Sequence, residues 1–152
     1  MRFAAVAALA LIVPAALSAQ TSTLDLETAT PIAGSWTYAA TADGSEATFV
    51  NPSALPQLWI HCAKATRRVS VAKPATVAAP FVQVWTSSAA RSIAASYNPL
   101  NNRIAIELTA YDPLLDALAF SRGRIAVGVT GLPALVAPAW PEIARVVEDC
   151  RS

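Results

Sequence analysis

The chain has two cysteines, Cys62 and Cys150, and their chemistry is the easiest to predict. Leu58, Ile60 and Cys62 alternate along a predicted strand, so they share one of its faces. A predicted C-terminal helix has an apolar face at helical spacing, made of Ile143, Val146, Val147 and Cys150. Both sulfurs therefore lie on surfaces that should be buried together. We predict a structural disulfide that closes a loop of about 89 residues and removes roughly 4–5 kcal/mol of unfolded-state freedom.

His61 precedes Cys62 and raises the alternative of a thiol nucleophile. Adjacent strand residues point to opposite faces, so this imidazole cannot reach the neighbouring sulfur to activate it. The sequence has no CxxC pair that would lower a thiol pKa. One histidine and two paired cysteines are too few ligands for a metal centre. We therefore interpret His61 as a strand residue beside Trp59, and expect neither a metal nor a cofactor.

Two carboxylates, Asp112 and Asp116, are four residues apart and could act as an acid/base pair. A structural role explains both, because Asp112 before Pro113 is a good helix N-cap and Asp116 complements the helix dipole. The sequence contains no GxSxG nucleophile elbow and no glycine-rich phosphate loop. These patterns do not predict an enzyme.

Aromatic residues form the candidate binding patch. Trp59 and His61 point away from the Leu58 side of their strand. Phe81 and Trp85 point away from the side of their strand that carries Val82 and Val84. If the two strands pair, these four side chains form one surface. That surface is sandwich core if a second sheet covers it, and a binding site if it stays open.

The N-terminus predicts export. Residue Arg2 is followed by an apolar run of about 14 residues, 4–17, and then by small residues, which is typical of a secretory signal peptide. We place this peptide at residues 1–19, a flexible lead-in at 20–31 and one domain at 32–152. No later apolar stretch reaches the roughly 20 residues of a transmembrane helix. The protein is therefore expected to be periplasmic or secreted, where a disulfide persists.

Charge gives little indication of a partner. Without Arg2 the exported chain has equal numbers of basic and acidic residues. This balance argues against nucleic acid as a partner and gives little drive toward anionic lipid. Another envelope protein remains the expected partner, and the oligomeric state is left open.

Hydrophobic periodicity predicts a mainly β (α+β) fold, an antiparallel β-sandwich of seven to nine strands. The connections between strands are too short for crossover helices. Strands are expected around residues 36–38, 47–50, 58–62, 69–72, 81–86, 93–97, 104–108, 125–129 and 135–137. A short helix is expected at 113–121 and a C-terminal helix at 141–149.

This layout carries a resemblance. A strand with Trp36, the strand at 58–62 that ends in Cys62, further alternating strands and a helix ending in Cys150 together resemble small secreted β-sandwich proteins of the invasion-associated locus B kind. They also resemble periplasmic accessory proteins of type VI secretion. Residues 112–124 are similar to a segment of uncharacterised alphaproteobacterial exported proteins. The resemblance implies a periplasmic β-sandwich without a cofactor and provides no functional residue.

The sequence therefore favours a non-catalytic periplasmic or secreted binding or accessory protein that acts through a surface. The alternative is an inhibitor or chaperone-like module for another exported protein. If the protein is an inhibitor, its structure should have a protruding loop such as residues 73–80. If it is an enzyme, its structure should have a pocket with convergent polar groups.

Overall fold

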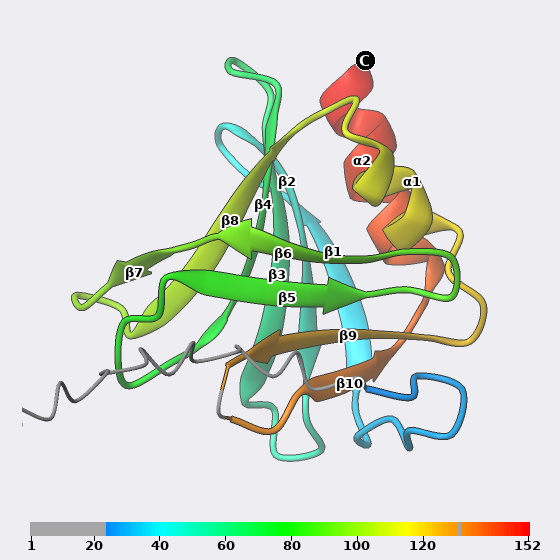
Figure 1. Cartoon of the computed structure of the whole chain (residues 1–152). Helices are drawn as coiled ribbons and strands as arrows, with labels where there is room; N and C mark the ends of the chain where they lie inside the picture. Colours follow the sequence, from blue (N-terminus) through cyan, green and yellow to red (C-terminus); the bar gives the residue numbers. More distant parts are fainter. Residues whose placement is uncertain (1–23, 131) are drawn as a thin grey trace, which may run out of the picture.

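The computed structural model describes residues 24–130 and 132–152. The predicted signal peptide, residues 1–19, lies outside the described residues. The described chain forms two antiparallel sheets and two helices, which confirms the predicted fold class (Figure 1). Its ten strands exceed the predicted seven to nine by one short strand.

Sheet A has six strands and sheet B has four. The spatial order in sheet A is β1 (Ser35–Ala40), β2 (Gly44–Val50), β3 (Pro56–Ala63), β4 (Arg68–Pro74), β8 (Arg103–Thr109) and β7 (Ser96–Asn98). The order in sheet B is β10 (Leu135–Pro138), β9 (Arg124–Val129), β5 (Phe81–Trp85) and β6 (Ala90–Ala94).

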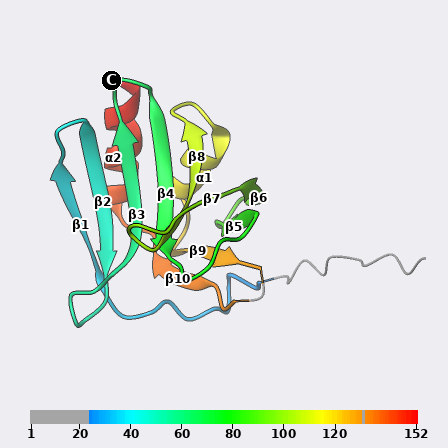
Figure 2. The ribbon, with the colours of Figure 1, turned by 90° about the vertical axis from the view of Figure 1, so that its left-hand side faces the viewer.

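The core lies between sheet A and a second layer made of sheet B and the helices α1 (Pro113–Ala119) and α2 (Pro141–Arg151). Leu58, Ile60 and Cys62 face this core and are fully buried, as their alternation predicts. Figure 2 shows the strands of sheet A side by side, with α2 behind them. The opposite face of sheet A therefore has no helix over it among the described residues.

The two sheets are joined through one extended segment. The alternation of Ile93, Ala95 and Tyr97 predicts a single strand, but the chain changes sheets between Ala94 and Ser96. The Ala95 N–H donates to the Pro80 carbonyl on the sheet B side, and Ser96 then pairs with Ala105 of β8. Alternation cannot show this change, because it depends on which face is buried and not on which strand is the neighbour.

The helices begin as the sequence predicts. The Asp112 carboxylate accepts a hydrogen bond from the Leu114 N–H, and Pro113 is the first helical residue of α1. The helix α1 ends at Ala119, two residues earlier than expected, and α2 continues to Arg151. Asp116 does more than complement the helix dipole, because it forms an ion pair with Arg151 that joins α1 to α2.

The predicted disulfide is present. Cys62 of β3 and Cys150 of α2 are bonded, their Cα atoms are 5.5 Å apart, and at most 1% of either residue is exposed. The bond fixes the C-terminal helix to the inner face of sheet A. The apolar positions of α2 named above are all buried.

The predicted flexible lead-in is described from residue 24 onward, and residues 20–23 lie outside the described residues. The described part has specific contacts. The Arg124 guanidinium donates to the carbonyls of Glu27 and Ala29, and the Ile32 N–H donates to the Val136 carbonyl of β10. These bonds hold the segment against the β10 edge of sheet B.

No helix in residues 24–130 and 132–152 is long and apolar enough to cross a membrane.

A carboxylate on α2 makes stability depend on pH. The Tyr38 hydroxyl of β1 donates to Asp149 Oδ2 at 2.5 Å, and this bond holds the pKa of the Asp149 carboxyl below its usual value of 3.8. A lowered folded-state pKa stabilises the fold above about pH 3.8, and this contribution is lost as the pH falls through the folded value. We predict that Tyr38→Phe reduces the loss of stability between pH 5 and pH 3, measured as urea midpoints. Tyr97→Phe is the control, because the Tyr97 hydroxyl bonds the neutral Asn102. Equal pH dependence in Tyr38→Phe and wild type would contradict this assignment.

Candidate functional site

The four residues of the predicted aromatic patch do not come together. Trp59 and His61 lie on β3 of sheet A, whose neighbours are β2 and β4. Phe81 and Trp85 lie on β5 of sheet B, whose neighbours are β6 and β9. The prediction required β3 and β5 to pair, and that pairing is wrong. Both strands have the expected inward and outward faces, so Trp59 and Trp85 point away from the core on opposite sides of the sandwich.

Trp85 belongs to the outer face of sheet B. Its ring lies against Gly128 of β9, where an added Cβ would come within 2.9 Å of ring atom Cζ3. Glycine at this position lets the indole lie close to the sheet. Phe81, at the start of the same strand, is 48% exposed. These two residues are therefore separate from Trp59.

Trp59 and His61 belong to a larger surface, the outer face of sheet A. We define this face by two rows of side chains that cross its central strands. One row is Thr48, Trp59, Ala72 and Ala105, and the next is Glu46, His61, Ser70 and Glu107. The strands are long and neighbouring, so the rows form a broad and nearly continuous surface.

Trp59 is at the centre of the outer face, yet only 9% of it is exposed. The Arg103 guanidinium covers the ring, with its Cζ 3.5 Å from the ring centroid. The small residues Ala72 and Ala105 separate the two side chains in the pairing register and leave room for this stacking. A guanidinium over an indole is a favourable cation–π contact that also hides apolar area from water.

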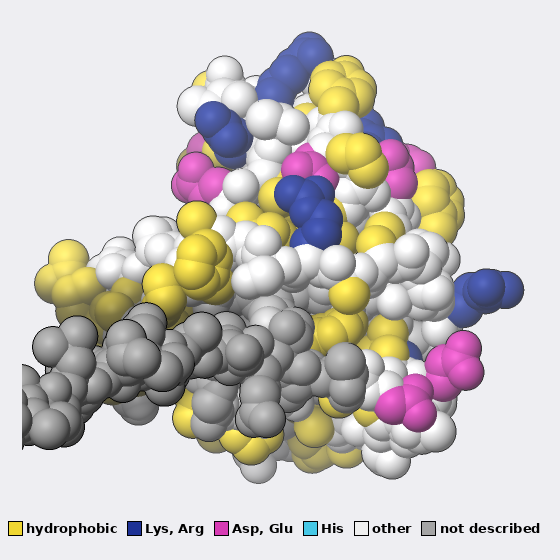
Figure 3. Space-filling view, in the orientation of Figure 1, with side chains coloured by type: hydrophobic (Ala, Val, Ile, Leu, Met, Phe, Trp, Pro, Cys, Tyr) yellow, Lys and Arg dark blue, Asp and Glu magenta, His cyan; other side chains and the backbone are white. Residues whose placement is uncertain are grey.

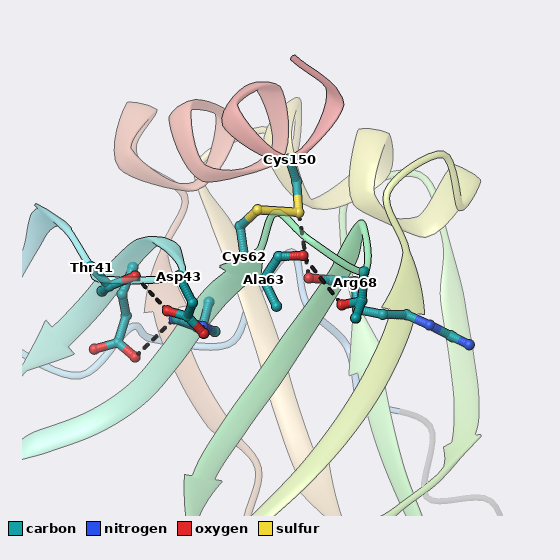
Figure 4. A network of polar contacts seen from close by, with 9 residues as sticks. Thr41, Asp43, Cys62, Ala63, Arg68 and Cys150 are labelled. Carbon is teal, nitrogen blue, oxygen red and sulfur yellow. Dashed lines mark hydrogen bonds and ion pairs between the residues drawn. A yellow bond between two sulfur atoms is a disulfide. The ribbon is translucent and has the colours of Figure 1, made fainter.

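His61 lies between two carboxylates. Its Nε2 is 3.1 Å from Asp43 Oδ2, and its Nδ1 is 3.7 Å from Glu46 Oε2. The Thr41 hydroxyl also donates to Asp43, and this bond, followed by the bond from His61, holds the pKa of the Asp43 carboxyl below its usual range. Figure 4 shows Thr41 and Asp43 beside the disulfide of Cys62 and Cys150. The Nε2 atom is thus hydrogen-bonded to Asp43, whereas Nδ1 is buried near Glu46 and makes no hydrogen bond.

The β1–β2 hairpin has a tight turn centred on Ala42 and Asp43. Thr41 and Gly44 exchange hydrogen bonds across the turn. Gly44 already belongs to β2, where an added Cβ would lie 2.0 Å from the Cys62 carbonyl oxygen. This close approach lets Asp43 reach His61.

A shallow hollow of about 360 Å³ opens beside His61. It is lined by Asp43, His61, Ala63, Thr66, Arg68, Ser70 and Glu107. Its lining combines two carboxylates, Asp43 and Glu107, with one cation, Arg68. Within residues 24–130 and 132–152, no group of three or more histidine, cysteine or acidic side chains is placed to hold a metal ion. The hollow can therefore offer hydrogen bonds and mixed charges to a flat partner surface.

Sequence reasoning missed Arg103 and Asp43. The alternation of side chains along β8 does place Arg103 on the outer face, because Ile104, Ile106 and Leu108 point inward. The contact with Trp59 also requires the order β3-β4-β8, which no local pattern contains. No local pattern indicates a role for Asp43, because its contact with His61 depends on the β2–β3 register.

Comparisons with family models, with curated proteins and with solved structures found no match. The resemblance to exported β-sandwich proteins therefore stays a prediction.

Proposed function

We propose that this protein is a non-catalytic periplasmic or secreted binding or accessory protein that holds another envelope protein on the outer face of sheet A. The observation that carries the proposal is the open face itself. The described helices and sheet B all pack on the other side of sheet A. What remains open is a broad surface of neutral and charged groups with one large aromatic ring at its centre.

The composition of the outer face supports a protein as partner. Trp59 under Arg103 forms an apolar and cationic centre, and tryptophan and arginine are the residue types enriched at binding hot spots. The surrounding Thr48, Ser70 and Glu107 provide a polar rim. A centre and rim of this kind fit a standard protein interface.

The arrangement at His61 supports binding over catalysis. A catalytic imidazole needs one nitrogen directed at a nucleophile or substrate and the other held by an orienting group. Here the two nitrogens face Asp43 and Glu46. The histidine is held as part of a charged network on the surface.

We predict that Ser70→Arg prevents partner capture. Ser70 lies between His61 and Glu107 in the pairing register, so a long charged side chain there blocks the centre of the outer face without touching the core. The matched control is Ser92→Arg, on the exposed strand β6 of sheet B. Each variant is expressed in the native cell, crosslinked with formaldehyde and detected by antibody as a higher-mass complex.

The expected result is loss of the complex in Ser70→Arg and its retention in Ser92→Arg, with wild-type thermal midpoints for both. Retention of the complex in Ser70→Arg would reject the outer face of sheet A as the binding surface.

A further inference from the structure

Three connections lie at one end of sheet A, where β2 and β4 end and where β3 and β8 begin. They are residues 51–55, 75–80 and 99–102, and together we call them the loop end. The register places them together, because Val50 pairs with Pro56, and Arg103 pairs with both Pro74 and Asn98. The Ala75 N–H also donates to the Asn102 carbonyl, which ties two of the connections to each other.

Each connection of the loop end exposes one large aliphatic side chain. Leu55 is 58% exposed, Val77 is 60% exposed and Leu100 is 94% exposed. Figure 3 shows hydrophobic side chains, and no acidic ones, around the β7 turn on the visible face. Three exposed aliphatic residues therefore lie at the same end of the domain, and each leaves apolar area in contact with water.

Leu100 is exposed in a defined conformation. Its N–H donates to Asn98 Oδ1 at 2.9 Å, and the Tyr97 hydroxyl donates to Asn102 Oδ1 at 3.1 Å. These two bonds brace the turn between β7 and β8 on both sides of Leu100. Figure 1 shows this turn at one end of the molecule. Holding a fully exposed leucine in this way reduces the entropy that its burial in a partner would cost.

The loop end carries positive charge only. The sequence has no aspartate or glutamate from residue 47 to residue 106. The cations of this stretch that lie at the loop end are Lys73, the last but one residue of β4, and Arg103, the first residue of β8. The Lys73 ammonium bonds only the Pro74 carbonyl, and Arg103 stacks on Trp59. Among the described residues, neither cation has a carboxylate within ion-pair distance.

We propose that the loop end docks on an anionic lipid bilayer. Leu100 and Val77 enter the headgroup region, and Lys73 and Arg103 face the lipid phosphates. Exposed aliphatics on convex loops with cations behind them match the layered chemistry of an anionic membrane surface, apolar inside and negatively charged at the interface. The balanced charge of the whole chain conceals this local asymmetry. The inference shares Arg103 with the proposed function but does not depend on it, since Leu100 and Val77, which enter the bilayer, lie on connections outside the outer face of sheet A.

The test is sedimentation of the exported protein with vesicles. One set is an equimolar mixture of phosphatidylglycerol and phosphatidylcholine, and the other is phosphatidylcholine alone. We expect the protein to bind the anionic vesicles and to dissociate as salt is raised, because the ionic part of the attraction is screened. Leu100→Ser should bind about tenfold more weakly, because it loses the burial of one leucine side chain. Lys73→Gln should bind severalfold more weakly.

Matched controls separate docking through the loop end from nonspecific binding to vesicles. Phe120→Ser removes another highly exposed apolar residue, 74% exposed at the end of α1, and Arg122→Gln removes an exposed cation next to it. Both controls should bind like wild type, and all four variants should keep the wild-type thermal midpoint. The proposal is overturned if the wild-type protein does not sediment with anionic vesicles. It is also overturned if Phe120→Ser loses as much binding as Leu100→Ser, or if a crosslinker at position 100 captures a protein while vesicles capture nothing.

Discussion

Replacing both cysteines, as Cys62→Ala with Cys150→Ala, is expected to lower the free energy of unfolding by about 4–5 kcal/mol. The bond joins residues 88 positions apart, so most of the ordered chain lies in the loop that it closes. Domains of this size are typically stable by only about 5–15 kcal/mol, so the loss is a large share of the total. Urea unfolding followed by tryptophan fluorescence measures the change.

Reduction provides the control for the cysteine variant. Wild-type protein unfolded in the presence of a thiol reductant should match the double variant, because both lose the same covalent link. If the oxidised protein and the double variant differ by less than about 1 kcal/mol, the disulfide does not hold α2 to sheet A in the way proposed.

Phe49→Ala is expected to be the most costly single substitution considered, at about 3–5 kcal/mol. Phe49 is fully buried, and its ring centroid lies 5.4 Å from that of Trp36. The ring also covers Gly34, where an added Cβ would come within 2.6 Å of Phe49 Cζ. Because this space is closed on several sides, truncation leaves a cavity that the neighbours cannot fill.

The adjacent residue gives the matched control for this core substitution. Thr48 lies on the same strand but points to the outer face of sheet A, so Thr48→Ala should change the free energy of unfolding by only about 0.5 kcal/mol. Chemical denaturation of both variants checks the assignment of faces. If Phe49→Ala and Thr48→Ala lower the free energy of unfolding by similar amounts, the assignment of the Phe49 side of β2 to the core is wrong.

Local patterns in the sequence predict much of the fold. The alternation of Leu58, Ile60 and Cys62 specifies the buried face of β3, and the spacing of Ile143 and Cys150 specifies the buried face of α2. These features depend on residues close in sequence, so short-range periodicity contains them. The disulfide follows from the two faces together, since both cysteines lie on buried surfaces.

The pairing of distant strands could not be predicted in the same way. Alternation predicts that Trp59 lies opposite the Leu58 side and Trp85 opposite the Val84 side of their strands, as observed, but nothing local shows that β3 and β5 belong to different sheets. The contact between Arg103 and Trp59 depends on the same long-range order. The candidate site was therefore half predicted: Trp59 and His61 belong to it, while Phe81 and Trp85 do not.

The distribution of charge in the fold differs from what the composition of the chain indicates. Without Arg2 the numbers of acidic and basic residues are equal, which predicts little attraction to anionic lipid, but this balance is an average over the rest of the chain. The stretch from residue 47 to residue 106 contains no acidic residue. Its cations Lys73 and Arg103 lie at one end of sheet A. Only the fold shows that this end also carries the exposed Leu100.

The most direct test of the central claim is a scan with a photocrosslinking amino acid in the native envelope. The reactive residue is placed in turn at Thr48, Ser70 and Glu107 on the outer face of sheet A, and at Gln83 and Ser92 on sheet B. Our account predicts one adduct of constant mass from the first three positions and none from the last two. Adducts only from sheet B, or equal adducts from both sheets, would contradict it.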